Sequence, residues 1–349
     1  MFFQKKNRNY NSVLEIENLA NQILSLTNKK SQPNTNKLNE LLRDVNLLKW
    51  NTKTFGYELG KFLEPNLKSI EMHGEPRKHN LTSKLTTQTD VESTWFKYWC
   101  NELKIAPFYH RKLWEFAFVL QALFEHEVLL SGNKCMGFGC GAEPLVSYFA
   151  SKNLFVMATD LDERSSKKKG WISTNQYLSN KEQGFKEELV DIDLYNKNVE
   201  YNNVDMNDIP DSFTGYDFCW SICALEHLGS INNGLEFIKN SLNVLKPGGI
   251  AIHTTEYNYT SDHETIDNWP TVLFRKCDMK KLSKDLSKHK HHLYDIDFSI
   301  GDMILDKFID IPPYSSKAYS SIKQTAHLKL TIDGFPCTCI GIIVKKSEL

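Results

Sequence analysis

The chain has little of several features that mark particular classes of protein. Its 42 Lys and Arg residues nearly balance 43 Asp and Glu residues, so the formal net charge is −1. Such a chain has no overall positive field to attract nucleic acid or an anionic membrane. No apolar run approaches the roughly 20 residues that span a bilayer, and the N-terminus lacks the apolar core of a signal peptide. We expect a cytoplasmic protein with no membrane span and no nucleic-acid partner.

The eight cysteines show no metal-binding pattern. None of them belongs to a C-x-x-C pair, the spacing that structural zinc sites commonly use. Most stand in apolar, strand-like runs, where cysteine behaves as a small hydrophobic residue. This usage fits a reducing compartment and gives no reason to expect structural zinc.

The first 80 residues differ from the rest of the chain. Residues 1–80 are rich in Asn, Lys and Leu, and apolar residues recur at helical spacing in 12–26 and 37–50. We expect a helical N-terminal extension that is dispensable for cofactor binding. It either pairs with another copy of the chain, giving a homo-oligomer, or is a loosely attached arm. Residues 75–89 have the composition of a linker, and residues 81–349 are expected to form one large domain.

Alternating apolar and helical segments dominate the larger domain. Buried parallel strands are predicted at 134–138, 154–159, 199–204, 216–222 and 250–255. With helices between them, they predict an α/β fold, a Rossmann-like, doubly wound sheet of seven strands. The last two strands come from a C-terminal antiparallel hairpin that turns at Asp333-Gly334. Residues 300–325 are rich in proline and aromatic residues and are expected to form an inserted loop.

Residues 134–160 carry the most informative pattern. A strand-like segment ends in Gly137, Gly139 and Gly141, and the next apolar run ends at Asp160. Glycines let the backbone pass close under a ligand, and an acid at the tip of the second strand can bind both ribose hydroxyls. The G-x-G-x-G spacing differs from the G-x-G-x-x-G of dinucleotide binders. It favours S-adenosylmethionine (SAM), which has no pyrophosphate.

Four further motifs follow the glycine loop in order: ATDLD (158–162), NVDMNDIP (203–210), YDFCWSICALEHL (216–228) and LKPGGIAIHTTE (245–256). Together the five motifs resemble the class I SAM-dependent methyltransferases. The resemblance implies that Asp205 faces the adenine amino group, that Met206 packs on the ring, and that Glu143 meets the cofactor's ammonium group or caps a helix. The full set implied to bind SAM is Gly137, Phe138, Gly139, Gly141, Glu143, Asp160, Leu161, Asp205, Met206 and Ser221.

Candidates for a catalytic base lie at the carboxyl ends of two predicted strands, where open α/β sheets bind ligands. Glu226 and His227 follow the fourth strand, and His253 and Glu256 end the fifth. A base would take the proton of a hydroxyl acceptor. Because His253 and Glu256 are three residues apart on a strand, they point to opposite faces, and only one of them should reach the site.

A metal site is a further possibility that the resemblance raises. Some relatives bind a divalent cation through E-x-x-E-H at this point, but here Cys223 replaces the first Glu. His263 would be the third ligand. Hard cations prefer oxygen ligands, so we expect no bound metal.

The flanks resemble, more loosely, bacterial methyltransferases of surface-sugar pathways. The resemblance covers about 88–345 and is carried by WFKYW, YHRKLWEF, HTTEYN, TVLFRKCD, IPPY and HLKL. It implies a small-molecule or glycan acceptor: a hydroxyl, less often an amine, of a sugar or glycoconjugate precursor in polysaccharide biosynthesis. The candidate acceptor-binding residues are Tyr109, Arg111, Arg275 and Tyr314, with the 300–325 loop as a lid. Two alternatives stay open, a metal-assisted RNA 2′-O-methyltransferase and a SAM-binding module without catalysis.

Overall fold

The computed structural model describes most of the large domain and part of the N-terminal extension. The described residues are 17–18, 20–21, 24–30, 32–68, 76–162, 178, 180–314 and 324–348. Much of the first predicted helix, over 12–26, lies outside these ranges, as does the 315–323 part of the predicted lid.

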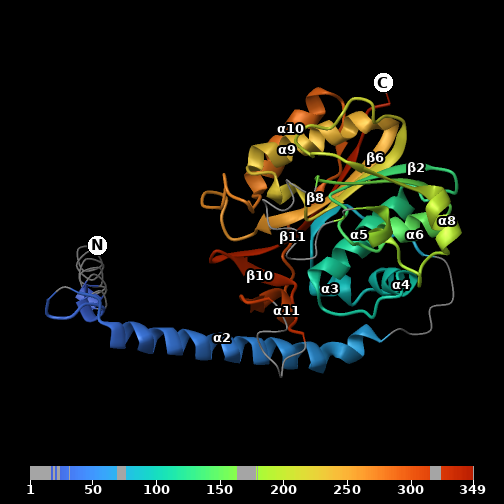
Figure 1. Ribbon diagram of the computed structural model, residues 1–349. Helices are drawn as coiled ribbons and strands as arrows, with labels where there is room; N and C mark the ends of the chain where they lie inside the picture. The colour runs from blue at the N-terminus through green and yellow to red at the C-terminus, as the bar shows by residue number, and fades with distance from the viewer. Residues whose placement is uncertain are drawn as a thin grey trace, which may run out of the picture.

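A twisted sheet forms the centre of the molecule (Figure 1). Its parallel part consists of β4 (Val199–Asn203), β3 (Phe155–Asp160), β2 (Lys134–Phe138), β5 (Tyr216–Ile222) and β6 (Leu245–Asn258), adjacent in that order. The five predicted parallel strands are therefore present, and the α/β Rossmann-like architecture is confirmed. The carboxyl ends of these strands meet at one edge of the sheet, as expected for a ligand site.

The C-terminal hairpin also forms as predicted. β10 (Lys329–Ile332) and β11 (Phe335–Lys345) are antiparallel, and β11 pairs with β6. The turn residues Asp333 and Gly334 have φ of 47° and 85°. This is the left-handed region that the Asp-Gly pair of a tight hairpin turn adopts readily.

The prediction of seven strands is wrong, because the described part of the chain forms an eleven-stranded sheet. The additional strands are two or three residues long: β1 (Ser83–Leu85), β7 (His292–Leu293), β8 (Ile296–Asp297) and β9 (Ile309–Asp310). β1 lies in the predicted linker and pairs with β11 and β8. Strands this short carry no recognisable alternation in sequence.

Helices cover both faces of the sheet. On one face, α4 (Thr94–Glu102), α5 (Arg111–Glu125) and α6 (Leu145–Ser151) pack with Cys135 and Trp220 of the strands. On the other, α9 (Ile231–Ser241) and α10 (Lys276–Lys288) pack with Met136 and Phe138. The smaller helical segments are α3 (Gln88–Val91), η2 (Lys181–Gly184), α8 (Ile192–Asn198), η3 (Leu225–His227), η4 (Leu242–Val244) and α11 (Ile304–Lys307). Within the described ranges, none of the helices is long and apolar enough to cross a membrane.

The N-terminal extension contributes one long helix, α2 (Thr35–Leu63), followed by η1 (Glu64–Leu67). Figure 1 shows the C-terminal half of α2 beside α11, while its N-terminal half projects beyond the domain. Lys53 forms a buried ion pair with Asp310, Nζ to Oδ1 at 2.6 Å. A Cβ added to Gly56 would stand 2.3 Å from the Phe308 ring, so glycine lets α2 approach this closely. The predicted boundary at residue 80 thus lies after a helix that packs on the larger domain.

We predict that Lys53→Met destabilises the fold by roughly 3–5 kcal/mol, because it leaves the Asp310 carboxylate buried without its cation. Urea unfolding would measure the change in free energy. Lys37→Met is the matched control, since Lys37 forms an exposed ion pair with Glu40 on the same helix and should change stability by about 1 kcal/mol or less. Equal effects of the two variants would contradict a structural role for the buried pair.

Candidate functional site

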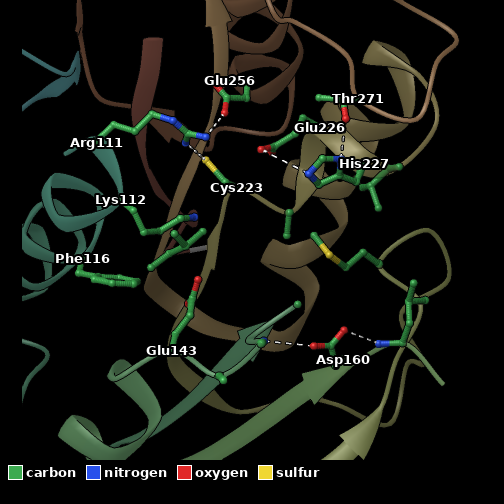
Figure 2. Close-up of a pocket in the computed structure, with 18 of the residues that line it drawn as sticks. Arg111, Lys112, Phe116, Glu143, Asp160, Cys223, Glu226, His227, Glu256 and Thr271 are labelled. Atoms are coloured by element: carbon green, nitrogen blue, oxygen red, sulfur yellow. Dashed lines mark hydrogen bonds and ion pairs between the residues drawn. The ribbon is translucent and has the colours of Figure 1, made fainter. Parts of the chain in front are cut away.

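A cavity of about 770 Å³ opens at the carboxyl ends of the parallel strands (Figure 2). Its floor includes the glycine loop after β2 and Asp160 at the end of β3. Its walls come from the segment after β5, from Glu256 on β6, from the start of α5, and from the C-terminal part of the chain. The volume falls in the range of ligand-binding clefts.

The glycine loop is held in place by Asp160. The Asp160 carboxylate accepts hydrogen bonds from the backbone N–H groups of Gly141 (3.1 Å), Leu161 (2.8 Å) and Leu178 (3.1 Å). Burial raises its pKa, and these three N–H groups oppose that rise. Gly139 and Gly141 have φ of 58° and 51°, and a Cβ on Gly139 would stand 2.9 Å from that of Ala224. Glycine is therefore required for both the backbone conformation and the close approach.

Glu143 presents a carboxylate oxygen that has no partner. Its Oε2 is buried and makes no hydrogen bond in the described structure, and burial raises its pKa well above the usual range. The helix that follows, α6, has no side-chain cap, so Glu143 does not serve as the helix cap. An unsatisfied buried carboxyl group at the cavity wall fits a cationic ammonium group.

Two predicted adenine contacts, Asp205 and Met206, line the same end of the cavity, together with Leu161. Asp205 is fixed by accepting a hydrogen bond from the N–H of Asn207, Oδ1 to N at 2.9 Å. Met206 is almost fully buried. With Glu143, Asp160 and the two left-handed glycines, these residues fit a nucleoside cofactor that carries an ammonium group.

Three residues predicted to bind the cofactor lie outside the cavity lining. Gly137 is packed tightly, since a Cβ there would stand 2.4 Å from both Cys140 and Trp220. Phe138 packs against Phe237, and Ser221 shares a hydrogen bond with His253. These three residues are packed within the protein and do not line the cavity.

A buried cluster of charges stands above the glycine loop (Figure 2). The Arg111 guanidinium contacts Glu115 at 2.9 Å, the Cys223 sulfur at 3.1 Å, and Glu256. Burial lowers the pKa of Arg111, but Glu256, Cys223 and Glu115 raise it more. Lys112 adds a second cation at 3.3 Å from Glu115. Arg111 therefore stays charged and ties α5 to the ends of β5 and β6.

The predicted bases Glu226 and Glu256 both line the cavity. Thr255 donates a hydrogen bond to Glu226 Oε2 at 3.0 Å, whereas Glu256 Oε2 is buried and has no partner in the described structure. Burial raises the pKa of Glu256 to about 7, opposed by Arg111 and assisted by Glu226. Burial also raises the pKa of Glu226, to about 6. Glu256 thus has both a free oxygen and a pKa near neutrality.

The two predicted histidine bases are placed differently. His227 lines the cavity, but its Nδ1 donates to the Pro270 carbonyl at 3.0 Å, and burial lowers its pKa to about 4. His253 is fully buried between Ser221 and Ser241, 2.8 and 3.1 Å from its ring nitrogens. Of the pair on β6, Glu256 reaches the cavity and His253 belongs to the core on the other side.

The outer wall contains two of the four predicted acceptor-binding residues. Arg111 and Tyr314 line the cavity, but Tyr109 and Arg275 do not. The hydroxyl of the buried Tyr109 lies 2.7 Å from Glu92 Oε1 and 2.9 Å from the Leu63 carbonyl, either of which can accept its proton. Arg275 pairs with Asp278 at the start of α10. The aromatic character of Tyr109 and the positive charge of Arg275 therefore did not suffice to predict that these residues line the cavity.

Lys112, Phe116 and Thr271 also line the wall, and nothing in the sequence marks them as site residues. Lys112 and Phe116 share α5 with Arg111. His327 lines the cavity from the C-terminal part of the chain. Asp310 accepts a hydrogen bond from its Nδ1 at 2.7 Å and also binds Lys53, so α2 supports this wall from behind.

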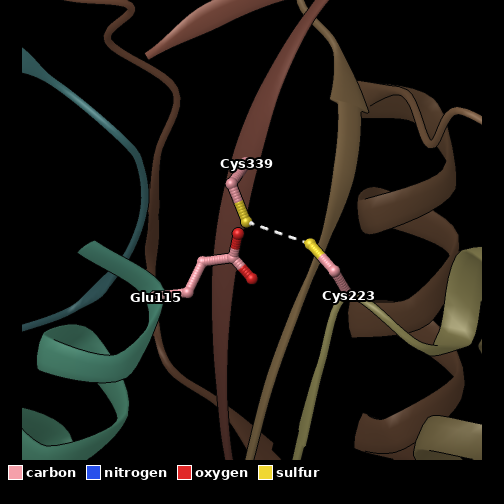
Figure 3. A group of neighbouring side chains, drawn as sticks. All are labelled: Glu115, Cys223 and Cys339. Atoms are coloured by element: carbon pink, nitrogen blue, oxygen red, sulfur yellow. Dashed lines mark hydrogen bonds between the residues drawn. The ribbon is translucent and has the colours of Figure 1, made fainter. Parts of the chain in front are cut away.

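Two sets of neighbouring side chains have the composition of a cation site. Glu115, Cys223 and Cys339 form one (Figure 3), with 3.9 Å between the sulfurs. Cys223, Glu226 and Glu256 form the other. Arg111 already contacts members of both sets, and burial raises the pKa of Cys223 well above its usual value. The guanidinium therefore supplies the positive charge here, beside a protonated thiol.

Comparison with known proteins indicates a methyltransferase domain in the centre of the chain. The profile of a methyltransferase domain family matches residues 136–253. Similar solved structures include a putative sarcosine dimethylglycine methyltransferase from Galdieria sulphuraria, with 17% identity, TM-score 0.41, and coverage of 66% of this chain and 84% of that one. Another is a SAM-dependent methyltransferase from Clostridium acetobutylicum, with 13% identity, TM-score 0.35, and coverage of 66% and 89%.

A third is phosphoethanolamine N-methyltransferase 2 from Haemonchus contortus, bound to phosphomonomethylethanolamine and S-adenosylhomocysteine. Its identity is 13% and its TM-score 0.40, with coverage of 65% of this chain and 52% of that one. No curated protein sequence matches. The matched segment spans the glycine loop, Asp160, Asp205 and most of β6. The chain therefore contains a methyltransferase domain over residues 136–253, and SAM is the cofactor that its site fits.

Proposed function

We propose that the enzyme methylates a hydroxyl group of a sugar or glycoconjugate precursor. The observation that carries this proposal is Glu256, whose buried Oε2 has no partner in the described structure. SAM, when bound, supplies a methyl group already activated by its sulfonium. A hydroxyl acceptor must also lose a proton, and Glu256 can take it because its pKa lies near 7.

The charge balance of the site supports a cationic cofactor next to a neutral acceptor. Four carboxyl groups, on Glu115, Glu143, Glu226 and Glu256, stand against two cations, Arg111 and Lys112. A carboxyl group that ionises when the positive charge of SAM lies beside it would stabilise that charge. Arg111 keeps Glu256 oriented while one carboxylate oxygen remains available to the acceptor.

The outer wall offers groups that suit a polyhydroxylated ligand. Tyr314 provides an aromatic face, and Thr271 a hydroxyl. His327 uses Nδ1 to bind Asp310, so Nε2 is the ring nitrogen left for an acceptor hydroxyl. Burial lowers the pKa of His327 while Asp310 raises it. A neutral imidazole oriented by a carboxylate is a good hydrogen-bond acceptor.

The alternatives are less well supported by these features. An unprotonated amine acceptor would not need the free oxygen of Glu256 as a base, because its nitrogen already has a lone pair with which to attack the methyl group. RNA 2′-O-methylation fits poorly with a net charge of −1, and a metal-assisted form would have to displace Arg111 from Glu256 and Cys223. A SAM-binding module without catalysis would not need a buried carboxyl group with a raised pKa such as that of Glu256.

The acceptor class can be tested with isotopically labelled SAM and a panel of nucleotide sugars, free sugars, small amines and RNA. We expect label on a sugar hydroxyl, located by mass spectrometry of the product. Transfer to an amine or to RNA alone would contradict the acceptor class. SAM binding without transfer to any member of the panel would favour the non-catalytic alternative.

We predict that Asp160→Ala weakens SAM binding at least about tenfold, because hydrogen bonds to a charged acceptor contribute roughly 1.5–3 kcal/mol each. The substitution also releases the N–H of Gly141. Titration calorimetry would measure the affinity, with thermal unfolding to verify the fold. Asp211→Ala, at an exposed position outside the cavity, is the control and should bind SAM normally. Unchanged affinity in Asp160→Ala would remove this residue from the cofactor site.

The pH dependence of methyl transfer should show whether Glu256 acts as the base. A base with a pKa of about 7 is protonated below that pH, so kcat/KM should rise as pH rises through 7 and then level off. Glu256→Gln should lower kcat by about 10²–10⁴-fold and remove this rise. Glu226→Gln should only shift the rise to lower pH, because the Glu226 charge helps to raise the Glu256 pKa. An unchanged profile in Glu256→Gln would exclude it as the base.

Tyr314 and Arg275 form a matched pair for locating the acceptor. Tyr314→Ala should raise KM for the acceptor and leave the SAM affinity unchanged, because Tyr314 lines the outer wall. Arg275→Ala should alter neither, since Arg275 lies outside the cavity and pairs with Asp278. Steady-state kinetics and calorimetry on both variants decide the question. Normal acceptor KM in Tyr314→Ala would move the acceptor away from the C-terminal segment.

A further inference from the structure

The helix α2 carries a set of large apolar side chains that the domain does not cover. Its buried residues, Lys53, Gly56 and Gly60, face the domain. Other positions are between 40% and 79% exposed: Leu38, Leu41, Leu42, Val45, Leu47, Leu48, Trp50, Phe55 and Phe62. Contiguous exposed apolar residues mark interaction surfaces. A helix whose N-terminal half projects alone would also be marginally stable without a partner.

Six of these nine exposed residues fall on a heptad repeat. Spacings of three and four alternate without interruption through residues 38, 41, 45, 48, 52, 55, 59 and 62, which we call the α2 seam. Every position of the seam is apolar except Thr52. Apolar residues every 3.5 positions, sustained for three to four heptads, are the signature of a coiled coil. An amphipathic helix that packed only on its own domain would follow the 3.6-residue period instead.

We propose that the α2 seam pairs with the α2 seam of a second copy of this chain in a parallel, two-stranded coiled coil. This goes beyond the methyl-transfer function and does not depend on the acceptor. The residues that flank the seam select the orientation. In a parallel pair in register, Asp44 lies beside the partner's Lys49, and the opposite charges attract.

An antiparallel pair would bring like charges together. The antiparallel alignment that keeps the seam positions opposite one another places Leu38 against the partner's Phe62. It then sets Asp44 beside the partner's Glu58 and Lys49 beside the partner's Lys49. Like-charge contacts across such an interface oppose association. The charges therefore favour the parallel arrangement.

The seam residues themselves support the same choice. β-branched residues at the first core position of the heptad, with leucine at the second, favour two parallel strands. Two of the four first positions hold β-branched residues, Val45 and Thr52, and two of the four second positions hold leucine, Leu41 and Leu48. One polar residue in a seam fixes the register of the two helices, and Thr52 is that residue here.

Most of the seam lies away from the face of α2 that contacts the domain, although its residue Leu59 also packs against the domain core. Lys53 follows Thr52 directly but points into the domain, where it binds Asp310. Pairing of two α2 helices would therefore leave the Lys53–Asp310–His327 contacts intact. The alternative occupant is the segment before α2, whose turn is closed by hydrogen bonds such as that from the N–H of Asn34 to the Leu26 carbonyl. If it folded back on the seam, the chain would remain monomeric.

Two adjacent leucines provide a matched test. Leu48 lies in the seam and Leu47 beside it, and they are 65% and 63% exposed. Sedimentation equilibrium of the full-length chain at micromolar concentration should show a dimer. Leu48→Asp should make it monomeric, while Leu47→Asp should remain dimeric, and both should bind SAM like the wild type. A monomeric wild type, or equal effects of the two substitutions, would overturn the proposal.

Cross-linking tests the orientation. In a parallel pair in register, residue 48 faces its own counterpart, so Leu48→Cys should give a covalent dimer when diamide oxidises the two thiols to a disulfide. The wild type, treated in the same way, is the control. Cross-linking that requires a mixture of Leu48→Cys and Thr52→Cys would show an antiparallel pair and overturn the parallel arrangement.

Discussion

The site depends on one interaction above all, the contacts of the Arg111 guanidinium with Glu115, Glu256 and Cys223. Three carboxyl groups and two thiols converge where α5 meets the ends of β5, β6 and β11. Without a cation, burial of these carboxylates in so small a volume would be strongly unfavourable. Arg111 holds the fold together at this point and also sets which oxygen of Glu256 remains free. The same arginine therefore stabilises the fold and orients the proposed catalytic base.

The cofactor half of the site and the acceptor half are built by different means. Backbone geometry makes the first: glycines in the left-handed region, N–H groups on Asp160, and a loop supported by Phe138 and Trp220. Side chains from distant parts of the chain make the second, with Arg111 from α5 and His327 from the C-terminal segment. The first is specified locally. The second can form only after the whole domain has assembled.

That difference explains what could be predicted from the sequence. The glycine loop, Asp160 and Asp205 were identified because each is part of a contiguous motif with a fixed structural role. The parallel strands and the Asp333-Gly334 turn were equally clear, since their signals are local. Tyr109 and Arg275 lie outside the cavity lining, and the sequence could not show this because an isolated aromatic or basic residue does not reveal which face of its helix is buried. The contact of His327 with Asp310, which also binds Lys53, joins segments far apart in the chain and has no local signal in the sequence.

The ion pair between Lys53 and Asp310 joins residues 257 positions apart. Contacts between such distant parts of a chain form late and slow the folding of a domain. During synthesis, α2 leaves the ribosome well before β9 and the C-terminal hairpin exist. Lys53 therefore stays hydrated until Asp310 has been synthesised, and the leucines of α2 are exposed during the same interval. The packing of α2 on the domain is therefore completed only when about the last 40 residues of the chain have been made, and until then its exposed apolar residues can aggregate.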